Sequence, residues 1–308
     1  MVTGAGGFLG SHIAQYFGEN GHKIAAVGRF NTTSAFTSLY PNLWKLCGMT
    51  LPDARFIDVI KEFTPDLLVH CAGTASVSDS VLDPYGDFQR TVEVCAFTLE
   101  AVRKHAPACR FILLSSAAVY GNPLQLPIPE EAPCKPVSPY GYHKLMCESL
   151  VEEYGRLHGL NTAILRIFSA YGERLSKQVV YDLCCKFSKR DCDEVKLDGT
   201  GTETRDFIHA RDVARSIEYL CTSNIDGIFN VASGAQTSIG SLALTLKEMM
   251  KSNKEICFTG KSRAGDPLYW QADITRLSAI GFTQSILLEE GLERYCAWFS
   301  SLAKGVAQ

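Results

Sequence analysis

The chain has 308 residues, of which 46% are hydrophobic and 20% are charged, and its formal net charge is −3. This composition is typical of a soluble globular protein with one large or two modest domains. The small net charge argues against nucleic acid and anionic membranes as partners. Because we find no membrane-spanning apolar run and no signal peptide at MVTGAGGFLG, we expect a cytoplasmic protein.

The twelve cysteines do not have the spacing of a disulfide framework or a metal site. No C-x-x-C pair occurs, Cys184 and Cys185 are adjacent, and most of the others lie in apolar runs such as LLVHCAG. In a reducing compartment such cysteines behave as small buried hydrophobic residues. We therefore expect no metal and no disulfide scaffold.

The first predicted element is a short strand over residues 1–3, which runs into the glycine-rich string TGAGGFLG. Gly4 permits a tight turn, Gly7 lets a phosphate approach the backbone, and Gly10 lets helix and strand pack closely. A helix that opens at Phe8 offers free N–H groups and the positive end of its dipole to a pyrophosphate. This string, between a strand and a helix, favours a dinucleotide-binding site.

The first half continues as short apolar runs that alternate with amphipathic stretches, the pattern of a parallel sheet covered by helices. The predicted strands are Lys23–Gly28, Asp66–Gly73, Arg110–Ser116 and Asn161–Phe168. The predicted helices are Phe8–Asn20, Arg55–Phe63, Tyr85–Lys104 and Tyr140–His158.

The stretch SPYGYHK places Tyr140 and Lys144 four residues apart, so that a helix would present both side chains on one face. Pro139 suits the first helical turn, where its missing N–H costs nothing. A neighbouring ammonium favours the phenolate form of a tyrosine. Taken alone, the pair is also typical of a surface tyrosine packed on a lysine stem, so the surrounding motifs must decide.

After residue 168 the alternation is less regular. The segment KRDCDEVKLDGTGTETRD is polar and turn-rich, and DFIHARDVARSIEYL reads as a strand followed by a helix. Gly227–Ser233 predicts one more strand of the main sheet, and SIGSLALTLKEMMKS and LEEGLERYCAWFSSLA predict amphipathic helices. We expect a second, smaller unit that is interleaved with the first.

Five motifs in the same order resemble those of the extended short-chain dehydrogenase/reductases, also called the NAD-dependent epimerase/dehydratase family. They are TGAGGFLG, HCAG, SSAAVYG with SPYGYHK, ETRDFIHARDVA and SRAGDPLYWQADITR. The resemblance implies an α/β fold, with a Rossmann-type doubly wound parallel sheet and a smaller C-terminal α/β substrate-binding domain. It assigns residues 1–168 plus about 205–232 to an NADP-binding domain, and about 169–204 plus 233–308 to a nucleotide-sugar-binding domain.

The same resemblance implies a role for each site residue. Tyr140 would be the general acid/base, Lys144 would hold the nicotinamide ribose, and Ser116 would hydrogen-bond the reacting sugar oxygen. A strand-end serine can also cap a helix, which stays open for Ser116. The implied cofactor contacts are Gly4, Gly7, Phe8, Leu9, Gly10, Arg29, Cys71, Ala72, Gly73, Tyr140, Lys144 and Ile167. The implied substrate contacts are Ser76, Ser116, Ala117, Ser169, Arg205, Arg263 and Asp266.

The end of the second strand bears on the choice of cofactor. NAD-using relatives place an acidic residue there, on the adenosine ribose, whereas this chain has Gly28 followed by Arg29. An arginine suits a 2′-phosphate, so the pattern favours NADP(H) over NAD. The alternative is a solvated surface arginine beside a dispensable contact.

Two arginines bear on the substrate. Arg205 and Arg263 correspond to family positions that clamp the diphosphate of a nucleotide sugar, and guanidinium groups match phosphate oxygens well. The alternative for Arg205 is an ion pair with Asp206 or Asp212. Relatives commonly carry Asn where this chain has Ser169, so the resemblance is weaker at that contact.

The residues after Ser116 narrow the reaction. Dehydratase relatives carry an Asp–Glu pair where this chain has Ala117 and Ala118; decarboxylases keep the Glu, and GDP-fucose synthases have a Cys at the Ala117 position. Two reactions remain that need only hydride transfer with one tyrosine. The first is NADPH-dependent reduction of a 4-keto, often 6-deoxy, nucleotide sugar; the alternative is 4-epimerisation with retained NAD(P). Gly28 and Arg29 favour the reductase.

Other classes fit less well. NADP-sensing relatives have lost the catalytic tyrosine, and a reductase of a non-nucleotide ketone would not need Arg205 and Arg263. His143 stands where relatives carry Ala or Ser, as either a proton-relay group or a bulkier packing residue. By resemblance, the outer faces of Tyr85–Lys104 and Tyr140–His158 predict a homodimer.

Overall fold

The computed structural model describes residues 1–305 except 31–32, 190–191 and 262–267. Its centre is a seven-stranded sheet in the order β10-β6-β5-β4-β1-β2-β3, and all neighbouring strands in it are parallel. The strands are β1 (Val2–Thr3), β2 (Ile24–Gly28), β3 (Leu43–Gly48), β4 (Leu67–His70), β5 (Arg110–Ser116), β6 (Thr162–Ile167) and β10 (Gly227–Val231). This confirms the predicted doubly wound parallel sheet.

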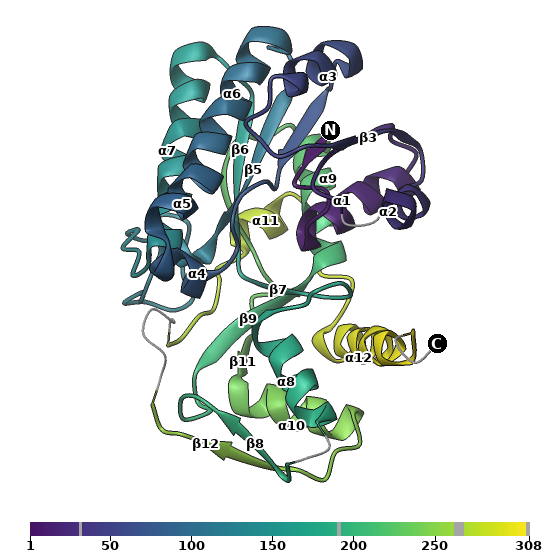
Figure 1. The fold of residues 1–308 in the computed structure, drawn as a ribbon. Helices are drawn as coiled ribbons and strands as arrows, with labels where there is room; N and C mark the ends of the chain where they lie inside the picture. Colours follow the sequence, from purple (N-terminus) through teal and green to yellow (C-terminus); the bar gives the residue numbers. More distant parts are fainter. Residues whose placement is uncertain (31–32, 190–191, 262–267, 306–308) are drawn as a thin grey trace.

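Helices cover both faces of the sheet, which is why its strands are apolar on both sides. One apolar core packs α3 (Arg55–Phe63), α6 (Val94–His105) and α7 (Pro139–His158) on one face. A second packs α1 (Phe8–Glu19), α9 (Ala210–Ser223) and α11 (Thr275–Ala279) on the other (Figure 1). In β5, for example, residues 111–114 are all buried, so the strand is fixed from both sides.

Several short elements were not predicted. The predicted helix Tyr85–Lys104 is three consecutive segments, α5 (Pro84–Phe88), a π-helical turn (Gln89–Glu93) and α6, preceded by α4 (Val77–Leu82). The carbonyl of Thr91 in the π-helical turn accepts a hydrogen bond from the Cys147 thiol at 3.6 Å. The prediction also lacked β3 and α2 (Thr33–Leu39). These segments are too short for periodicity to identify.

A smaller lobe lies below the large sheet in Figure 1. It contains a three-stranded sheet of β7 (Ser169–Tyr171), β9 (Thr204–His209) and β11 (Gln236–Ser238), and the pair β8 (Glu194–Leu197) and β12 (Glu255–Phe258). Its apolar core includes α8 (Gln178–Ser188), α10 (Ile239–Met249) and α12 (Leu288–Gly305). The segment predicted as turn-rich contains β8.

The predicted domain boundary near residue 205 stays a prediction. In the structure β9 pairs with β7 and β11, and α9 is the next element to pack against the large sheet. Within the described part of the chain, no helix combines the length and apolar character needed to cross a membrane.

Candidate active site

The glycine-rich turn between β1 and α1 forms a cradle against two neighbouring segments. Gly4 has a φ of +67°, and a Cβ on it would lie 2.7 Å from the backbone N of Ala72. A Cβ on Gly10 would lie 2.2 Å from the Gly4 carbonyl oxygen. No described side chain caps the start of α1 at Gly7, so the first N–H groups of the helix point to an anion site. The close approaches and the uncapped helix fit the pyrophosphate of a dinucleotide.

Arg174 lies beside this turn, although the sequence interpretation did not identify it. Its Nε donates to the Ser11 hydroxyl at 3.1 Å, and its Nη2 donates to Gln15 Oε1 at 3.0 Å. Burial lowers the pKa of the guanidinium from its ordinary value. Arg174 and the turn line a cavity of about 230 Å³ together with Phe8, Phe36 and Trp298. An arginine held at a helix N-terminus adds a positive charge where a pyrophosphate would lie. The sequence feature that could have drawn attention to Arg174 is the charged pair that follows Tyr-Gly in SAYGER.

The loop after β4 completes the predicted cofactor side. Cys71, Ala72 and Gly73 follow the strand, and Cys71 and Ala72 lie against Gly4. Burial raises the pKa of the Cys71 thiol to about 12, so the thiol stays protonated. Ile167 at the end of β6 is paired with Ser116 at the end of β5. The predicted cofactor residues therefore lie along one edge of the sheet.

The start of α7 carries Tyr140 and Lys144. The Ser138 hydroxyl caps the helix by accepting from the Gly141 N–H at 3.2 Å. Lys144 is buried, its Nζ donates to the Leu114 carbonyl at 3.0 Å, and it lies 5.9 Å from the centre of the Tyr140 ring. The predicted pair thus shares one helix face, next to the end of β5.

Ser116 makes the structural contact that was considered as an alternative for it, and its catalytic role stays a prediction. Its Oγ accepts from the Ala118 N–H at 3.2 Å and so caps a 3₁₀ turn, Ala117–Val119. Its own hydroxyl proton remains able to donate. A Cβ on Gly141 would lie 2.7 Å from the Ala118 carbonyl oxygen, so α7 packs tightly on this turn. The structure therefore brings Ser116, Tyr140 and Lys144 into one region.

A buried ion pair below the site was also missed. Arg166 in β6 and Glu148 in α7 are 2.7 Å apart, with side chains 4% and 3% exposed. The Ser115 hydroxyl donates to the same carboxylate at 2.5 Å, and Arg166 donates to the Tyr120 hydroxyl at 2.9 Å. The pair fixes α7 to β5 and β6, the two strands that end at Ser116 and Ile167.

The predicted substrate residues come from both lobes. The Nη1 of Arg205 donates to the Thr204 carbonyl at 2.9 Å, and its guanidinium lies 5.7 Å from the centre of the Trp270 ring. Ser169 pairs with Phe207 on the same small sheet, and Ser76 caps α4 by accepting from Asp79 N–H at 3.2 Å. Arg263 and Asp266 lie outside the described residues.

The two carboxylates considered as ion-pair partners of Arg205 make other contacts. Asp206 is fully buried and accepts from the backbone N–H groups of Ser233, Gly234 and Ala272 at 2.8–3.0 Å. Asp212 pairs with Arg215 at 2.7 Å. Asp206 therefore holds the segments at Ser233 and Ala272 in place.

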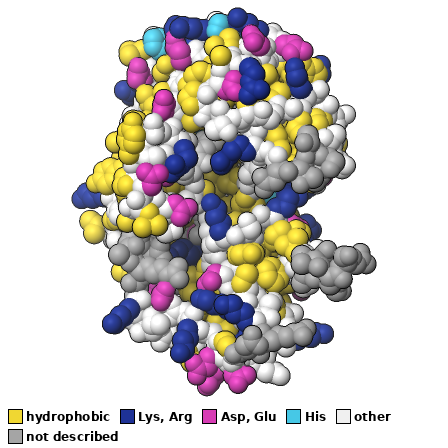
Figure 2. Space-filling model, in the orientation of Figure 1, with side chains coloured by type: hydrophobic (Ala, Val, Ile, Leu, Met, Phe, Trp, Pro, Cys, Tyr) yellow, Lys and Arg dark blue, Asp and Glu magenta, His cyan; other side chains and the backbone are white. Residues whose placement is uncertain are grey.

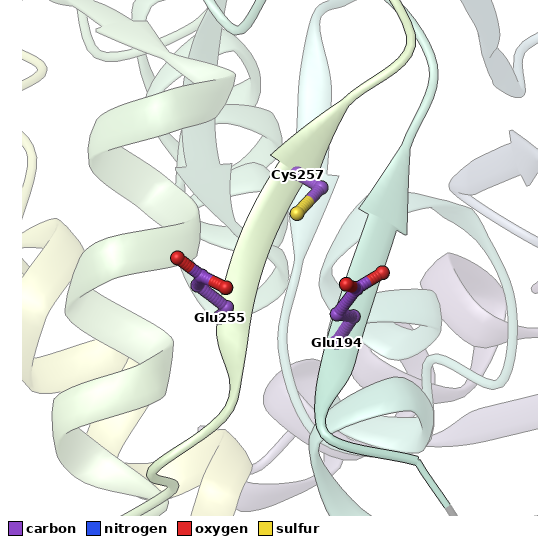
Figure 3. A group of neighbouring side chains, drawn as sticks. All are labelled: Glu194, Glu255 and Cys257. Atoms are coloured by element: carbon purple, nitrogen blue, oxygen red, sulfur yellow. The ribbon is translucent and has the colours of Figure 1, made fainter.

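Among the described residues, one group of potential metal ligands lies together on β8 and β12, away from the glycine-rich turn (Figure 3). Ligand atoms of Glu194, Glu255 and Cys257 are within 4.8 Å of one another, and both glutamates are exposed. Exposed acidic groups commonly gather in this way without an ion, so we assign no function to them.

Comparison with known proteins confirms the family to which the sequence motifs pointed. The UDP-glucose 4-epimerase of Azospirillum brasilense is 28% identical, over all of this chain and 94% of the relative. The Thermotoga maritima UDP-glucose 4-epimerase, solved with UDP-glucose, is 26% identical with a TM-score of 0.88 over 98% of both chains. The Bacillus cereus UDP-glucuronic acid 4-epimerase, solved with UDP-glucuronic acid and NAD, is 25% identical with a TM-score of 0.88 over 98% of both chains. Residues 1–232 match the sequence profile of the NAD dependent epimerase/dehydratase family, and the chain therefore belongs to that family.

Proposed function

We propose that the protein is a nucleotide-sugar 4-epimerase that retains its nicotinamide cofactor. The observation that carries this proposal is the start of α7, which sets Tyr140 and Lys144 against Ser116 beside two alanines. Ala117 and Ala118 cannot transfer protons, so the site lacks the acidic side chains that the related dehydratases and decarboxylases carry at these positions. The named relatives support the epimerase over the reductase that Gly28 and Arg29 favoured.

Each site residue has a defined task in this reaction. The cofactor, when bound, supplies reversible hydride transfer at C4 of the sugar. Tyr140 takes the proton of the 4-hydroxyl and returns it, while Ser116 donates to the same oxygen and orients it. Lys144, held by the Leu114 carbonyl, holds the ribose and stabilises the phenolate. Because the reaction needs no other acid or base, Tyr140 alone can serve the oxidation of the 4-hydroxyl and the reduction of the resulting ketone.

The substrate assignment rests on the small lobe. Arg205, packed over Trp270, would bind a diphosphate oxygen with its planar guanidinium. Arg263 and Asp266 would complete this contact, and Ser76, Ala117 and Ser169 would contact the sugar or phosphate. The relatives are named for UDP-linked sugars, so these are the first substrates to test.

A second candidate is the NADPH-dependent 4-ketoreductase. The observation that favours it is Arg29, which is exposed and directly follows β2. A Cβ added to Gly6 would lie only 1.9 Å from the Arg29 carbonyl oxygen, so the backbones of the two residues are in close contact. Residue 29 thus borders the glycine-rich turn, and Gly28 offers no carboxylate to repel a 2′-phosphate. The contact favours the reductase through the choice of cofactor, because the related UDP-glucuronic acid 4-epimerase was solved with NAD.

We also propose a homodimer. Exposed apolar residues gather on α4, α5 and the first half of α7. These helices lie on the left in Figure 1, and Figure 2 shows hydrophobic side chains along the same edge. They are Val81, Leu82, Tyr85, Phe88, Tyr142 and Met146. Exposed apolar side chains on neighbouring helices suit burial against a second copy.

The deciding experiment incubates the purified protein with UDP-glucose, UDP-N-acetylglucosamine, UDP-glucuronic acid and a 4-keto-6-deoxy nucleotide sugar. Sugar composition is followed by NMR and NADPH by absorbance in the same sample. Interconversion of 4-epimers with no net NADPH loss is the expected result. One NADPH consumed for each ketone lost would replace the epimerase by the reductase.

A further inference from the structure

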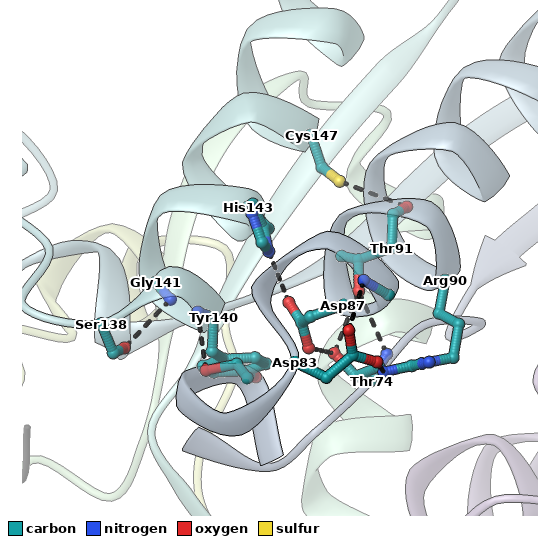
Figure 4. Close-up of polar contacts among 12 residues, drawn as sticks. Thr74, Asp83, Asp87, Arg90, Thr91, Ser138, Tyr140, Gly141, His143 and Cys147 are labelled. Atoms are coloured by element: carbon teal, nitrogen blue, oxygen red, sulfur yellow. Dashed lines mark hydrogen bonds and ion pairs between the residues drawn. The ribbon is translucent and has the colours of Figure 1, made fainter. Parts of the chain in front are cut away.

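The carboxylate of Asp87 is fully buried in α5 and is bonded on both of its oxygens (Figure 4). Oδ1 accepts from the Thr74 hydroxyl, and Oδ2 accepts from the Nδ1–H of His143 at 2.5 Å. A buried carboxylate costs several kcal/mol unless such partners compensate. Asp87 therefore connects two segments that are far apart in the sequence.

These two segments are the loop after β4 and the catalytic helix. Thr74 directly follows the predicted cofactor contact Gly73, and its N–H donates to the Thr91 hydroxyl at 3.3 Å. His143 is buried in α7 between Tyr140 and Lys144. The ring of His143 meets the Phe88 ring edge-on, with 5.7 Å between centroids. The imidazole is thus held on two sides.

We propose that Asp87 and His143 form a positioning pair for Tyr140 and Lys144. The pair fixes the first turns of α7 relative to the loop after β4, and so sets the catalytic side chains against the cofactor side. Neither residue touches the reacting atoms. A misplacement of about 1 Å in such a site can lower the rate about 100-fold, so the pair acts on kcat. The kinetic part of this inference rests on the proposed function.

The kinetic test compares three variants. His143→Leu fills similar space without a hydrogen-bond donor, whereas His143→Asn keeps a donor near the Nδ1 position. Ile60→Ala is the stability control, because it removes a buried side chain from the distant helix α3. We expect His143→Leu to lower kcat per folded molecule about 10- to 100-fold with KM changed less than about threefold. His143→Asn should recover most of this loss, and Ile60→Ala should keep the wild-type kcat per folded molecule. A His143→Leu enzyme with wild-type kcat, or no recovery with His143→Asn, overturns the proposal.

A second readout needs no turnover. Amide hydrogen exchange of residues 141–144 and 71–76 is measured in the purified wild-type, His143→Leu and Ile60→Ala proteins. We expect both segments to exchange faster in His143→Leu than in wild type, and by more than in Ile60→Ala. The reason is that the Asp87–His143 pair holds both segments. Unchanged exchange there overturns the positioning role, whereas a wild-type enzyme that converts no nucleotide sugar counts against the proposed function alone.

Discussion

The Nζ of Lys144 donates to the carbonyl oxygen of Leu114 at 3.0 Å, two residues before the end of the strand that carries Ser116. This bond fixes the ammonium between the strand and the Tyr140 ring. In the proposed reaction, an ammonium held there would stabilise the phenolate form of Tyr140.

Removing the Tyr140 hydroxyl should slow proton transfer far more than it weakens cofactor binding, because the other predicted cofactor contacts remain. We expect Tyr140→Phe to lower kcat about 10²–10⁴-fold. Tyr142→Phe is the matched control, because Tyr142 is 52% exposed on the same helix. Steady-state kinetics and cofactor binding by fluorescence measure the two effects. Equal activity of the two variants would remove Tyr140 from the catalytic role.

Arg29 and Arg174 should differ in their effect on cofactor affinity. Arg29→Gln should weaken NADP(H) about 10- to 100-fold and leave NAD(H) almost unchanged, since a charged hydrogen bond contributes about 1.5–3 kcal/mol. Arg174→Gln should weaken both, because the pyrophosphate is common to them. Titration calorimetry with each cofactor measures this. If Arg29→Gln binds NADP(H) as wild type does, the arginine is a solvated surface residue.

Breaking the buried pair of Arg166 and Glu148 should be costly, but removing both charges should cost less. Arg166→Met leaves a buried carboxylate without its partner, at about 3–5 kcal/mol of unfolding free energy. Adding Glu148→Leu should recover at least half of that loss. Urea unfolding of the single and double variants at neutral pH gives the coupling energy. Additive losses would contradict the account, since partners in contact must couple.

Acid should destabilise the protein partly through His70. Burial, followed by the charge of Lys144, lowers the pKa of His70 from 6.5 to about 3. Between these values the unfolded chain binds a proton that the folded chain does not. The unfolding free energy therefore falls as pH drops below about 6.5, by about 1.4 kcal/mol per pH unit for this group, and the group has no effect above it. Urea unfolding at pH 7, 6 and 5 should give a shallower slope for His70→Asn, by about one proton. An unchanged slope would contradict the prediction.

The apolar patch on α4 and α5 should hold two copies together. Leu82 and Tyr85 are 84% and 72% exposed, and Leu82→Glu with Tyr85→Glu should convert a dimer to a monomer. Leu287→Glu is the control, because Leu287 is 66% exposed before α12 in the other lobe. Light scattering after size exclusion measures the mass. A monomeric wild-type protein would reject the proposal.

The parts of the site that could be predicted are those in which a local pattern determines the geometry. The glycine-rich turn and the Tyr140–Lys144 spacing each depend on residues only a few positions apart, so both could be identified from the sequence. The contacts Arg166–Glu148 and Asp87–His143 join residues 18 and 56 positions apart, so only the packing of strands and helices reveals them. Arg174 reaches Ser11 across 163 positions, for the same reason.

The connections between the two lobes limit how the enzyme can open. A single residue, Phe168, separates β6 in the large sheet from β7 in the small one, and α9 follows β9 without any intervening residue. Phe168 is itself buried, and Asp206 in β9 is bonded to the segments at Ser233 and Ala272. Hinges need a few residues that absorb backbone rotation, and these two crossings offer almost none. In the proposed epimerase, a bound sugar would therefore turn between its two faces by its own rotation, without a large closure of one lobe onto the other.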